Sequence, residues 1–177
     1  MNPDLLIGRL EAFAYQLRSL VKDIPQDQAR WRPAEGGLSM LEIVGHLCDR
    51  ETLEFRPRLE LTLRDSERPW PRVEPEDGID ELNYNERDLV REAERFQRER
   101  LKSVQWLRGL GAANWTATHE HPKLGPVRAG DLLVSWASND AMMTRMIAHR
   151  SWDLSQRDAP GFTSGYVGSW DGEPAAS

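Results

Sequence analysis

The sequence predicts an all-α protein, an antiparallel four-helix bundle with a long crossover. Apolar residues recur at helical spacing in four long segments, at about 3–21, 40–64, 86–108 and 129–149. A proline-containing, acidic connection over 69–82 separates the second segment from the third, which indicates a crossover. No heptad repeat persists long enough to favour a coiled coil.

The first two helices carry clear start signals. Asn2 is a predicted N-cap, and Pro3 suits the first helical position. Ser39 and Glu42 have the spacing of a capping box, in which each side chain bonds the other residue's backbone N–H. Pro57 lacks a backbone donor, so we expect it to kink the second helix or end it early.

The second half of the chain is punctuated by turn residues. Asn85 is the predicted cap of the third helix, and Gly109 lies just past its end. The stretch 115–127 is short and contains two prolines and a glycine, so we expect either a small β-hairpin or a loop before the last helix. His149 is expected near the C-terminus of that helix, where a positive charge is favourable.

Two units are expected, a bundle over 1–150 and an irregular C-terminal arm over 151–177. The arm is rich in Gly, Ser and Pro and carries Trp152, Tyr166 and Trp170. We expect these aromatic rings to pack either on the bundle or on a second subunit, and we predict a homodimer.

Composition excludes several functional classes. The 177 residues carry a net charge of −6, which argues against a general nucleic-acid-binding surface. No apolar run approaches the roughly 20 residues of a membrane span, and no signal peptide is expected. The single cysteine, Cys48, allows no intrachain disulfide, which suits a cytoplasmic location.

His46 is the most informative candidate for chemistry. It lies on the stripe of the second helix that includes Ile43 and Arg50, with Glu42 about one turn before it and Asp49 about one turn after it. One interpretation is a half-buried histidine that bonds a neighbouring carboxylate. The other is a metal ligand or general base.

Two segments carry a family resemblance. Residues 38–51 (LSMLEIVGHLCDRE) follow Trp31-Arg32-Pro33, and residues 121–143 (HPKLGPVRAGDLLVSWASNDAMM) lead into the fourth helix. In order and spacing these motifs resemble the starts of the second and fourth helices in the DinB-like superfamily, which includes YfiT-type proteins. The resemblance extends over about 5–147.

The resemblance implies a four-helix bundle that binds a divalent metal, often zinc or nickel, through three histidines. One family histidine matches His46, whereas the other two positions, one turn apart on the fourth helix, fall on Asn139 and Met143. An amide oxygen is a poor zinc ligand, and a thioether is a soft one. We therefore expect a degenerate metal site and no cofactor, and we predict that Trp136, one turn before Asn139, lines the remaining cavity.

Carboxylates could complete an altered site. Asp49, Glu51 and Asp140 are close in sequence to His46 or Asn139. Asp140 is rotated by about 100° from Asn139 on an ideal helix and should point elsewhere. Asp49 is more simply the hydrogen-bond partner of His46. Zinc or nickel held by His46 and one or two carboxylates remains the alternative.

Three further side chains have less specific patterns. His119 and His121 would face one side of a strand, which suits either a two-histidine metal pair or an exposed polar loop. Cys48 is close to His46 in sequence, but successive residues of a helix point about 100° apart. We interpret Cys48 as a small buried apolar residue and not as a nucleophile.

Two functional classes follow from these residues. The first is a metal-independent protein that binds a small molecule in a pocket at the family metal-site positions. The second, implied by the resemblance, is a metal-dependent hydrolase or a thiol transferase of the bacillithiol, mycothiol or glutathione type with altered ligands.

Overall fold

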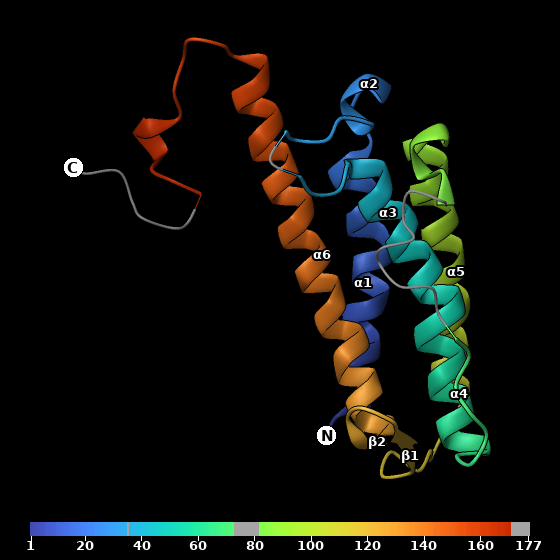
Figure 1. Ribbon diagram of the computed structural model, residues 1–177. Helices are drawn as coiled ribbons and strands as arrows, with labels where there is room; N and C mark the ends of the chain where they lie inside the picture. The colour runs from blue at the N-terminus through green and yellow to red at the C-terminus, as the bar shows by residue number, and fades with distance from the viewer. Residues whose placement is uncertain (35, 73–81, 171–177) are drawn as a thin grey trace.

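The computed structural model describes residues 1–34, 36–72 and 82–170. They form a bundle of four long helical segments, with a small sheet at one end and an arm leaving the other (Figure 1). The elements are α1 (Pro3–Val21), α2 (Gln26–Ala29), α3 (Met40–Asp49), η1 (Arg50–Phe55), α4 (Arg56–Arg64), η3 (Tyr84–Glu86), α5 (Leu89–Gly109), β1 (Thr118–His121), β2 (Gly125–Arg128), α6 (Ala129–Asp158) and η4 (Gly165–Val167).

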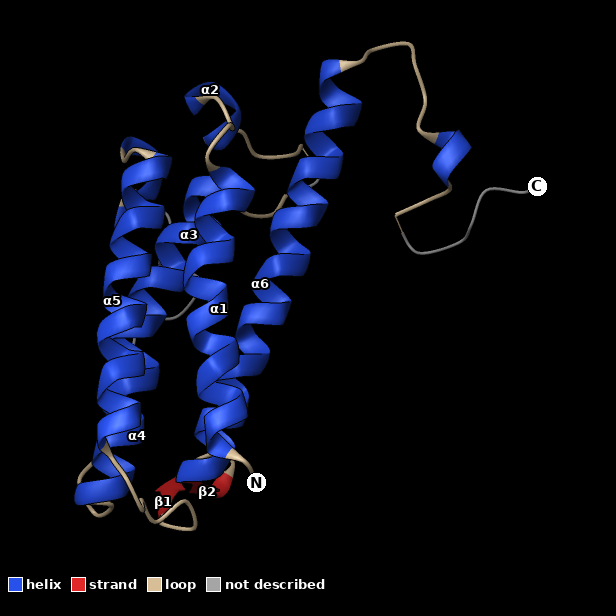
Figure 2. Ribbon diagram, turned by 180° about the vertical axis from the view of Figure 1, so that it is seen from behind, coloured by secondary structure: helices blue, strands red, loops and turns tan. Residues whose placement is uncertain are grey.

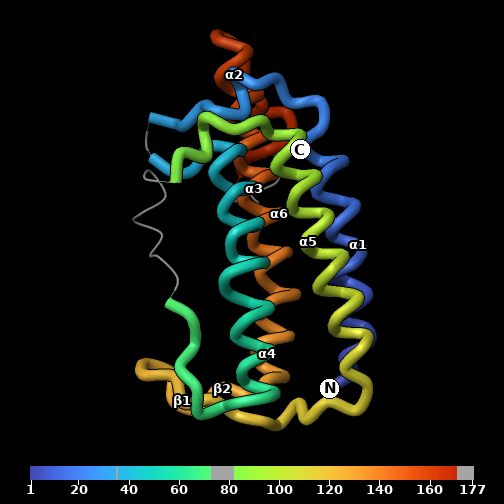
Figure 3. The backbone as a smooth tube through the Cα atoms, turned by 90° about the vertical axis from the view of Figure 1, so that its right-hand side faces the viewer, coloured from blue at the N-terminus to red at the C-terminus, as the bar shows by residue number. Residues whose placement is uncertain are grey.

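Chain direction shows why a long connection is needed. The helices α1 and α6 run one way along the bundle, while the continuous segment α3–η1–α4 and helix α5 run the other way (Figures 1 and 3). The end of α4 and the start of α5 therefore lie at opposite ends of the bundle. The crossover predicted for 69–82 falls between them, and its residues 73–81 lie outside the described residues.

The predicted caps of the first two helices are confirmed. The Asn2 side chain accepts a hydrogen bond from the backbone N–H of Leu5. At the second helix, Ser39 Oγ accepts from the Glu42 backbone at 3.1 Å, and Glu42 Oε2 accepts from the Ser39 backbone at 2.7 Å. Local sequence alone therefore predicts where these two helices begin.

The predicted cap of the third helix is wrong. The cap is Asp88, whose Oδ1 accepts from the backbone N–H of Arg91 at 2.9 Å. Asn85 instead lies in the 3-10 turn η3, where its side chain bonds both Ser39 and Glu42. The Asn85 side chain therefore bonds the start of α3 and does not cap α5.

The last helix is longer than expected. Helix α6 continues past His149 to Asp158, because no proline or glycine interrupts the chain before Pro160 and Gly161. The expected boundary between residues 150 and 151 therefore falls inside a helix. His149 is not terminal, and its ring stacks on Trp170 of the arm with centroids 4.7 Å apart.

The core consists of two apolar clusters separated by a charged layer. One cluster joins residues of α1, α3, α5 and α6 around Leu47 and Phe96, and the other joins α1, α4, α5 and α6 around Leu59 and Trp136. On α5, the buried Arg100 lies one helical turn after Phe96 of the first cluster. The bundle therefore encloses a cation between its two apolar clusters.

A glycine permits one close approach to the second helix. The ring of Tyr84 lies directly against Gly45 of α3, where a Cβ atom would overlap the ring carbons. From this position the Tyr84 hydroxyl donates a hydrogen bond to Asp49 at 2.8 Å. Gly45 therefore allows the turn η3 to pack onto α3.

The small hairpin is confirmed. Strands β1 and β2 pair antiparallel, with Thr118 opposite Arg128 and His121 opposite Gly125 (Figure 2). Gly125 has a φ of 70°, a left-handed conformation that glycine adopts at little cost. Among the described residues, no helix combines the length and the apolar character that crossing a membrane requires.

Candidate functional site

The second helix changes its winding where the candidate site lies. Residues Arg50–Phe55 form a π-helical segment between α3 and α4. Pro57 lies just after it, and its ring would clash with the carbonyl four residues earlier in a regular α-helix. The wider π turn accommodates the missing donor without ending the helix, and such turns are frequent at functional sites. Pro57 was expected to kink the helix or end it early, and the helix does not end there but continues through the π turn into α4.

Arg50 is the residue of this segment that contacts Asn139 on the fourth helix. Its Nη1 donates a hydrogen bond to Asn139 Oδ1 at 2.7 Å. Its Nε donates to Glu54 at 2.7 Å, and its guanidinium lies 4.8 Å from the centroid of the Phe55 ring. Arg50 follows His46 by one helical turn and lies on the same helix face. That face was expected to contact Asn139, and Arg50 is the residue that makes the contact.

Sequence reasoning placed Arg50 on the same stripe as His46 but assigned it no role. The signal that could have found it is its spacing of four residues from His46, which puts both side chains on one helix face. His46 itself is half-buried. No sequence pattern predicted the π turn, which begins at Arg50.

Two predicted pocket residues belong to the core instead. Trp136 is fully buried, stacks on Phe55 with centroids 5.6 Å apart, and donates its Nε1–H to Glu51 at 2.8 Å. Met143 packs in the apolar cluster with Leu47. The expectation that Trp136 lines the cavity is wrong, because the indole reaches inward to a buried carboxylate.

The candidate carboxylates also have other partners. Asp49 accepts hydrogen bonds from Tyr84 at 2.8 Å and from Arg95 at 2.8 Å, so it faces α5 and η3. Asp140 accepts two hydrogen bonds from Arg100, at 2.6 and 2.9 Å. The inference that Asp140 points away from Asn139 agrees with this geometry.

A buried charge cluster underlies the site. The Arg100 guanidinium bonds Glu51 at 2.8 Å and Asp140 at 2.6 Å, and it lies 4.7 Å from the Phe96 ring centroid. Burial raises the pKa of Asp140 to about 6, although the bonds from Arg100 oppose that shift. Two carboxylates thus share one cation. Sequence reasoning considered Glu51 only as a possible metal ligand and missed Arg100, because a buried charge looks like solvated helix surface in a sequence.

A pocket of about 420 Å³ opens beside Arg50 and Asn139. Its walls come from η1 and α4 on one side, α6 on the other, and the hairpin with Trp70 at one end. The lining residues are Arg50, Glu54, Phe55, Arg58, Trp70, His121, Leu124, Val127, Leu132, Ser135, Ser138, Asn139 and Met142. Of the six predicted site residues, only Asn139 lines it.

The hairpin histidines lie around Trp70, and of the two only His121 lines the pocket. His119 is buried, shares a hydrogen bond with the Ser66 carbonyl at 2.8 Å, and stacks on Trp70 with centroids 4.4 Å apart. The His121 ring lies 5.6 Å from Trp70, so both rings face one side of the strand as expected. The expectation of an exposed polar loop is wrong for His119, because Ser66 and Trp70, which follow α4, contact its ring.

No group of three or more metal-ligating His, Cys, Asp or Glu side chains occurs among residues 1–34, 36–72 and 82–170. Cys48 is fully buried, and burial raises the pKa of its thiol to about 12. The thiol is therefore protonated at neutral pH, as its interpretation as a small apolar residue requires.

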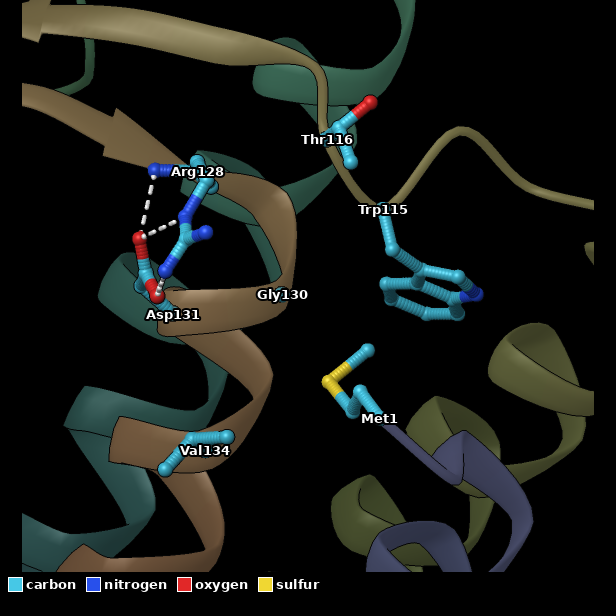
Figure 4. A pocket seen from close by; sticks show the side chains of 7 residues that line it. All are labelled: Met1, Trp115, Thr116, Arg128, Gly130, Asp131 and Val134. Carbon is cyan, nitrogen blue, oxygen red and sulfur yellow. Dashed lines mark hydrogen bonds and ion pairs between the residues drawn. The ribbon is translucent and has the colours of Figure 1, made fainter.

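A second, unrelated cavity of about 380 Å³ lies at the base of the bundle (Figure 4). Trp115 and Met1 line one side of it, and Arg128 and Asp131 line the other. The Asp131 carboxylate accepts from the Arg128 guanidinium at 2.8 Å and from its backbone N–H at 3.1 Å. These bonds close the start of α6, so we assign the polar groups here to helix capping.

The family model of the DinB superfamily matches residues 9–147. The chain belongs to the DinB superfamily. The fold agrees with that of YfiT from Bacillus subtilis, a solved structure described as a probable metal-dependent hydrolase with an unusual four-helix bundle topology. The two chains are 20% identical with a TM-score of 0.75, over 86% of this chain and 87% of that one. No protein with a curated description matches this DinB-superfamily chain.

Proposed function

We propose that this DinB-superfamily protein binds a small molecule without a metal, in the pocket between η1–α4 and α6. The observation that carries the proposal is the hydrogen bond from Arg50 Nη1 to Asn139 Oδ1 at 2.7 Å. It puts a permanent positive charge against one of the three positions where the family resemblance implies a metal ligand.

The residues at these positions do not fit zinc or nickel. The single oxygen of the Asn139 amide already accepts from Arg50, and a dication beside that guanidinium would be repelled. Met143 offers a soft thioether and lies in an apolar cluster. Only His46 remains as a donor of the expected type, and catalytic zinc normally needs three protein ligands.

The alternative is a metal-dependent hydrolase or thiol transferase in which carboxylates replace the histidines. The fold shared with YfiT favours it, but the described geometry supports it less. Asp49 is held by Tyr84 and Arg95, and Asp140 is held by Arg100. Recruiting either carboxylate to His46 would break a buried or half-buried ion pair, which costs free energy.

Metal analysis of the purified protein separates the two proposals. Wild type and His46→Ala are each incubated with zinc or nickel, dialysed, and assayed for metal per chain. We expect well under one equivalent in both proteins. One tightly held equivalent in wild type that disappears in His46→Ala would overturn metal-independent binding.

Occupancy of the pocket is tested by blocking it. Ser138 is exposed on α6 and lines the pocket, so Ser138→Trp should fill the space without disturbing the core. Ser155→Trp makes the same change at an exposed site further along α6. In a ligand-observed NMR screen of small charged and neutral fragments, we expect Ser138→Trp to abolish binding of the best fragments and Ser155→Trp to preserve it. Equal binding to both variants would contradict the proposed pocket.

The predicted homodimer is a separate proposal. In the arm, the side chains of Phe162 and Tyr166 are 85% and 95% exposed. Burying such rings against a second copy would be favourable. Light scattering coupled to size exclusion should give twice the mass of the 20.3 kDa chain, and a monomer mass would refute the dimer.

A further inference from the structure

Two residues that line the pocket beside Asn139 carry buried hydrogen-bond donors that lack acceptors. Asn139 is 4% exposed, and its Oδ1 is used by Arg50. Its Nδ2 has no acceptor among the described residues, and neither has the buried Nε of Arg58 on α4. Buried donors are normally satisfied, and leaving one unpaired costs free energy. Both residues line the pocket, but the two unpaired nitrogens themselves have almost no exposed surface. A small turn of each side chain toward the pocket would bring them to a ligand with acceptor atoms, which would supply what the protein does not.

The charged residues that line the pocket also favour a negatively charged ligand. Glu54 is the one carboxylate among the described lining residues, and its Oε1 accepts from Arg58 at 2.7 Å while its Oε2 accepts from Arg50 at 2.7 Å. Both of its oxygens are therefore engaged by guanidinium groups. Two cations and one anion leave the wall with one uncompensated positive charge, and that charge favours a monoanion.

The rest of the pocket is apolar. Phe55 lines it from η1, Trp70 closes the hairpin end, and aliphatic side chains cover much of the remaining wall. These aliphatic residues are Leu124, Val127, Leu132 and Met142. The pocket's volume of about 420 Å³ lies within the range of small-molecule sites. A ligand that fills it must therefore carry an uncharged, apolar body as well as an anionic group.

From these three features we propose that the ligand is a small organic acid, a single carboxylate attached to a compact apolar body. The inference rests on the proposed pocket and specifies the chemistry that the pocket selects. The carboxylate accepts from the unpaired donors of Arg58 and Asn139 once these side chains turn toward the pocket, and its charge is balanced by the uncompensated guanidinium. The apolar body packs between Phe55, Trp70 and the aliphatic wall.

The test compares acids with their neutral amides. Two matched pairs serve as probes, para-fluorophenylacetate with its amide and hexanoate with hexanamide, titrated by ligand-observed NMR. We expect at least one acid to bind at least tenfold more tightly than its amide, and Ser138→Trp to abolish that binding. A para-fluorophenyl phosphate arm distinguishes a monoanion from a dianion, and tighter binding of the phosphate than of the acid would overturn the carboxylate assignment.

Variants of Arg58 test whether this side chain is responsible for the preference for the acid over the amide. Arg58→Met keeps the side-chain length and removes the charge and the Nε–H, so the acid should bind at least tenfold more weakly while the amide is unaffected. Arg58→Lys keeps the charge but not the Nε–H and should fall between the two. Arg64→Met is the matched control, because Arg64 lies on the same helix, is 67% exposed and pairs with Glu60. Circular dichroism checks that each variant is folded.

The outcomes separate this inference from the proposed function. If amides bind as tightly as acids and Ser138→Trp blocks both, the pocket stands and the acid preference is refuted. If no probe of either charge is sensitive to Ser138→Trp, both proposals fail. If the acid preference survives Arg58→Met unchanged, the assignment of the donor is wrong.

Discussion

Replacing Arg100 with methionine tests the charged layer that divides the core. The methionine side chain keeps much of the apolar stem and removes the guanidinium. Arg100 is fully buried and makes three hydrogen bonds to the carboxylates of Glu51 and Asp140. Once it is gone, both carboxylates remain buried without a cation.

The expected magnitude follows from that loss. Removing one partner of a buried ion pair destabilises a protein by about 3–5 kcal/mol, because a charge is left without compensation. A domain of this size has a free energy of unfolding of about 5–15 kcal/mol. The variant should therefore lose a large fraction of its stability at pH 8, and part of the population should unfold under mild denaturing conditions.

The loss should depend on pH in a definite direction. In wild type, burial raises the pKa of Asp140 to about 6 from an ordinary value of 3.8. A carboxyl whose folded pKa exceeds its unfolded pKa takes up a proton more readily in the native state, so stability rises as pH falls from about 6 to 4. Without Arg100 the pKa should rise further, and the penalty should be smaller at pH 5 than at pH 8.

Urea unfolding followed by circular dichroism and tryptophan fluorescence measures both effects. Arg108→Met is the matched control, since Arg108 also lies on α5 and makes two hydrogen bonds to a carboxylate, Glu11, but at the surface. Exposed ion pairs are screened by solvent, so this variant should change the urea midpoint little. The combination of Arg100→Met with Glu51→Gln and Asp140→Asn should recover part of the stability, because no buried charge then lacks a partner.

The reasoning is refuted if Arg100→Met costs no more than Arg108→Met at pH 8. It is also refuted if the penalty is the same at pH 5 and pH 8, because the buried carboxylates would then carry no unfavourable charge.

Three further outcomes are expected. Gly45→Ala should destabilise the fold by about 1–3 kcal/mol in urea unfolding, because the new Cβ overlaps the tyrosine ring of the 3-10 turn. Gly8→Ala, with open space around it in α1, should instead stabilise the fold by about 0.5–1 kcal/mol. A Gly45→Ala protein as stable as wild type would contradict the packing. Asp140→Asn should flatten the rise in stability that wild type shows as pH falls from about 6 to 4, and an unchanged profile would assign that rise to another group. Asn139→His with Met143→His, made in an Arg50→Met background that removes the neighbouring cation, should create zinc or nickel affinity in calorimetry, since it restores imidazoles one helical turn apart. If this folded variant binds no metal, our placement of the family ligand positions is wrong.

Much of the fold was predictable from local patterns. Asn2 with Pro3, and Ser39 with Glu42, marked two helix starts through contacts between residues only a few positions apart. Apolar periodicity predicted the four long segments, whereas the turn residues of 115–127 left a hairpin and a loop open, and the structure has the hairpin. The resemblance to the DinB superfamily, carried by motif order and spacing, is confirmed by the family match over 9–147.

The candidate site was less predictable, because its geometry depends on contacts between distant residues. The bond from Arg50 to Asn139 spans 89 positions, and the π turn that orients Arg50 follows from Pro57 within an otherwise regular pattern. Trp136 has the spacing of a pocket residue, yet the indole turns to Glu51 in the core. Spacing gives a helix face but not which neighbour that face meets.

The sequence by itself determined the helices, their order, the long crossover and the absence of two of the three histidines that the family resemblance implies. Only the tertiary structure decided which charges are buried, because Arg50 and Arg100 look alike in a helical pattern. One bonds Asn139 at the edge of a pocket, and the other bonds two carboxylates in the buried core. The physical reason is that side-chain periodicity is set within a few residues, whereas burial and partner choice are set when helices far apart in the chain pack together.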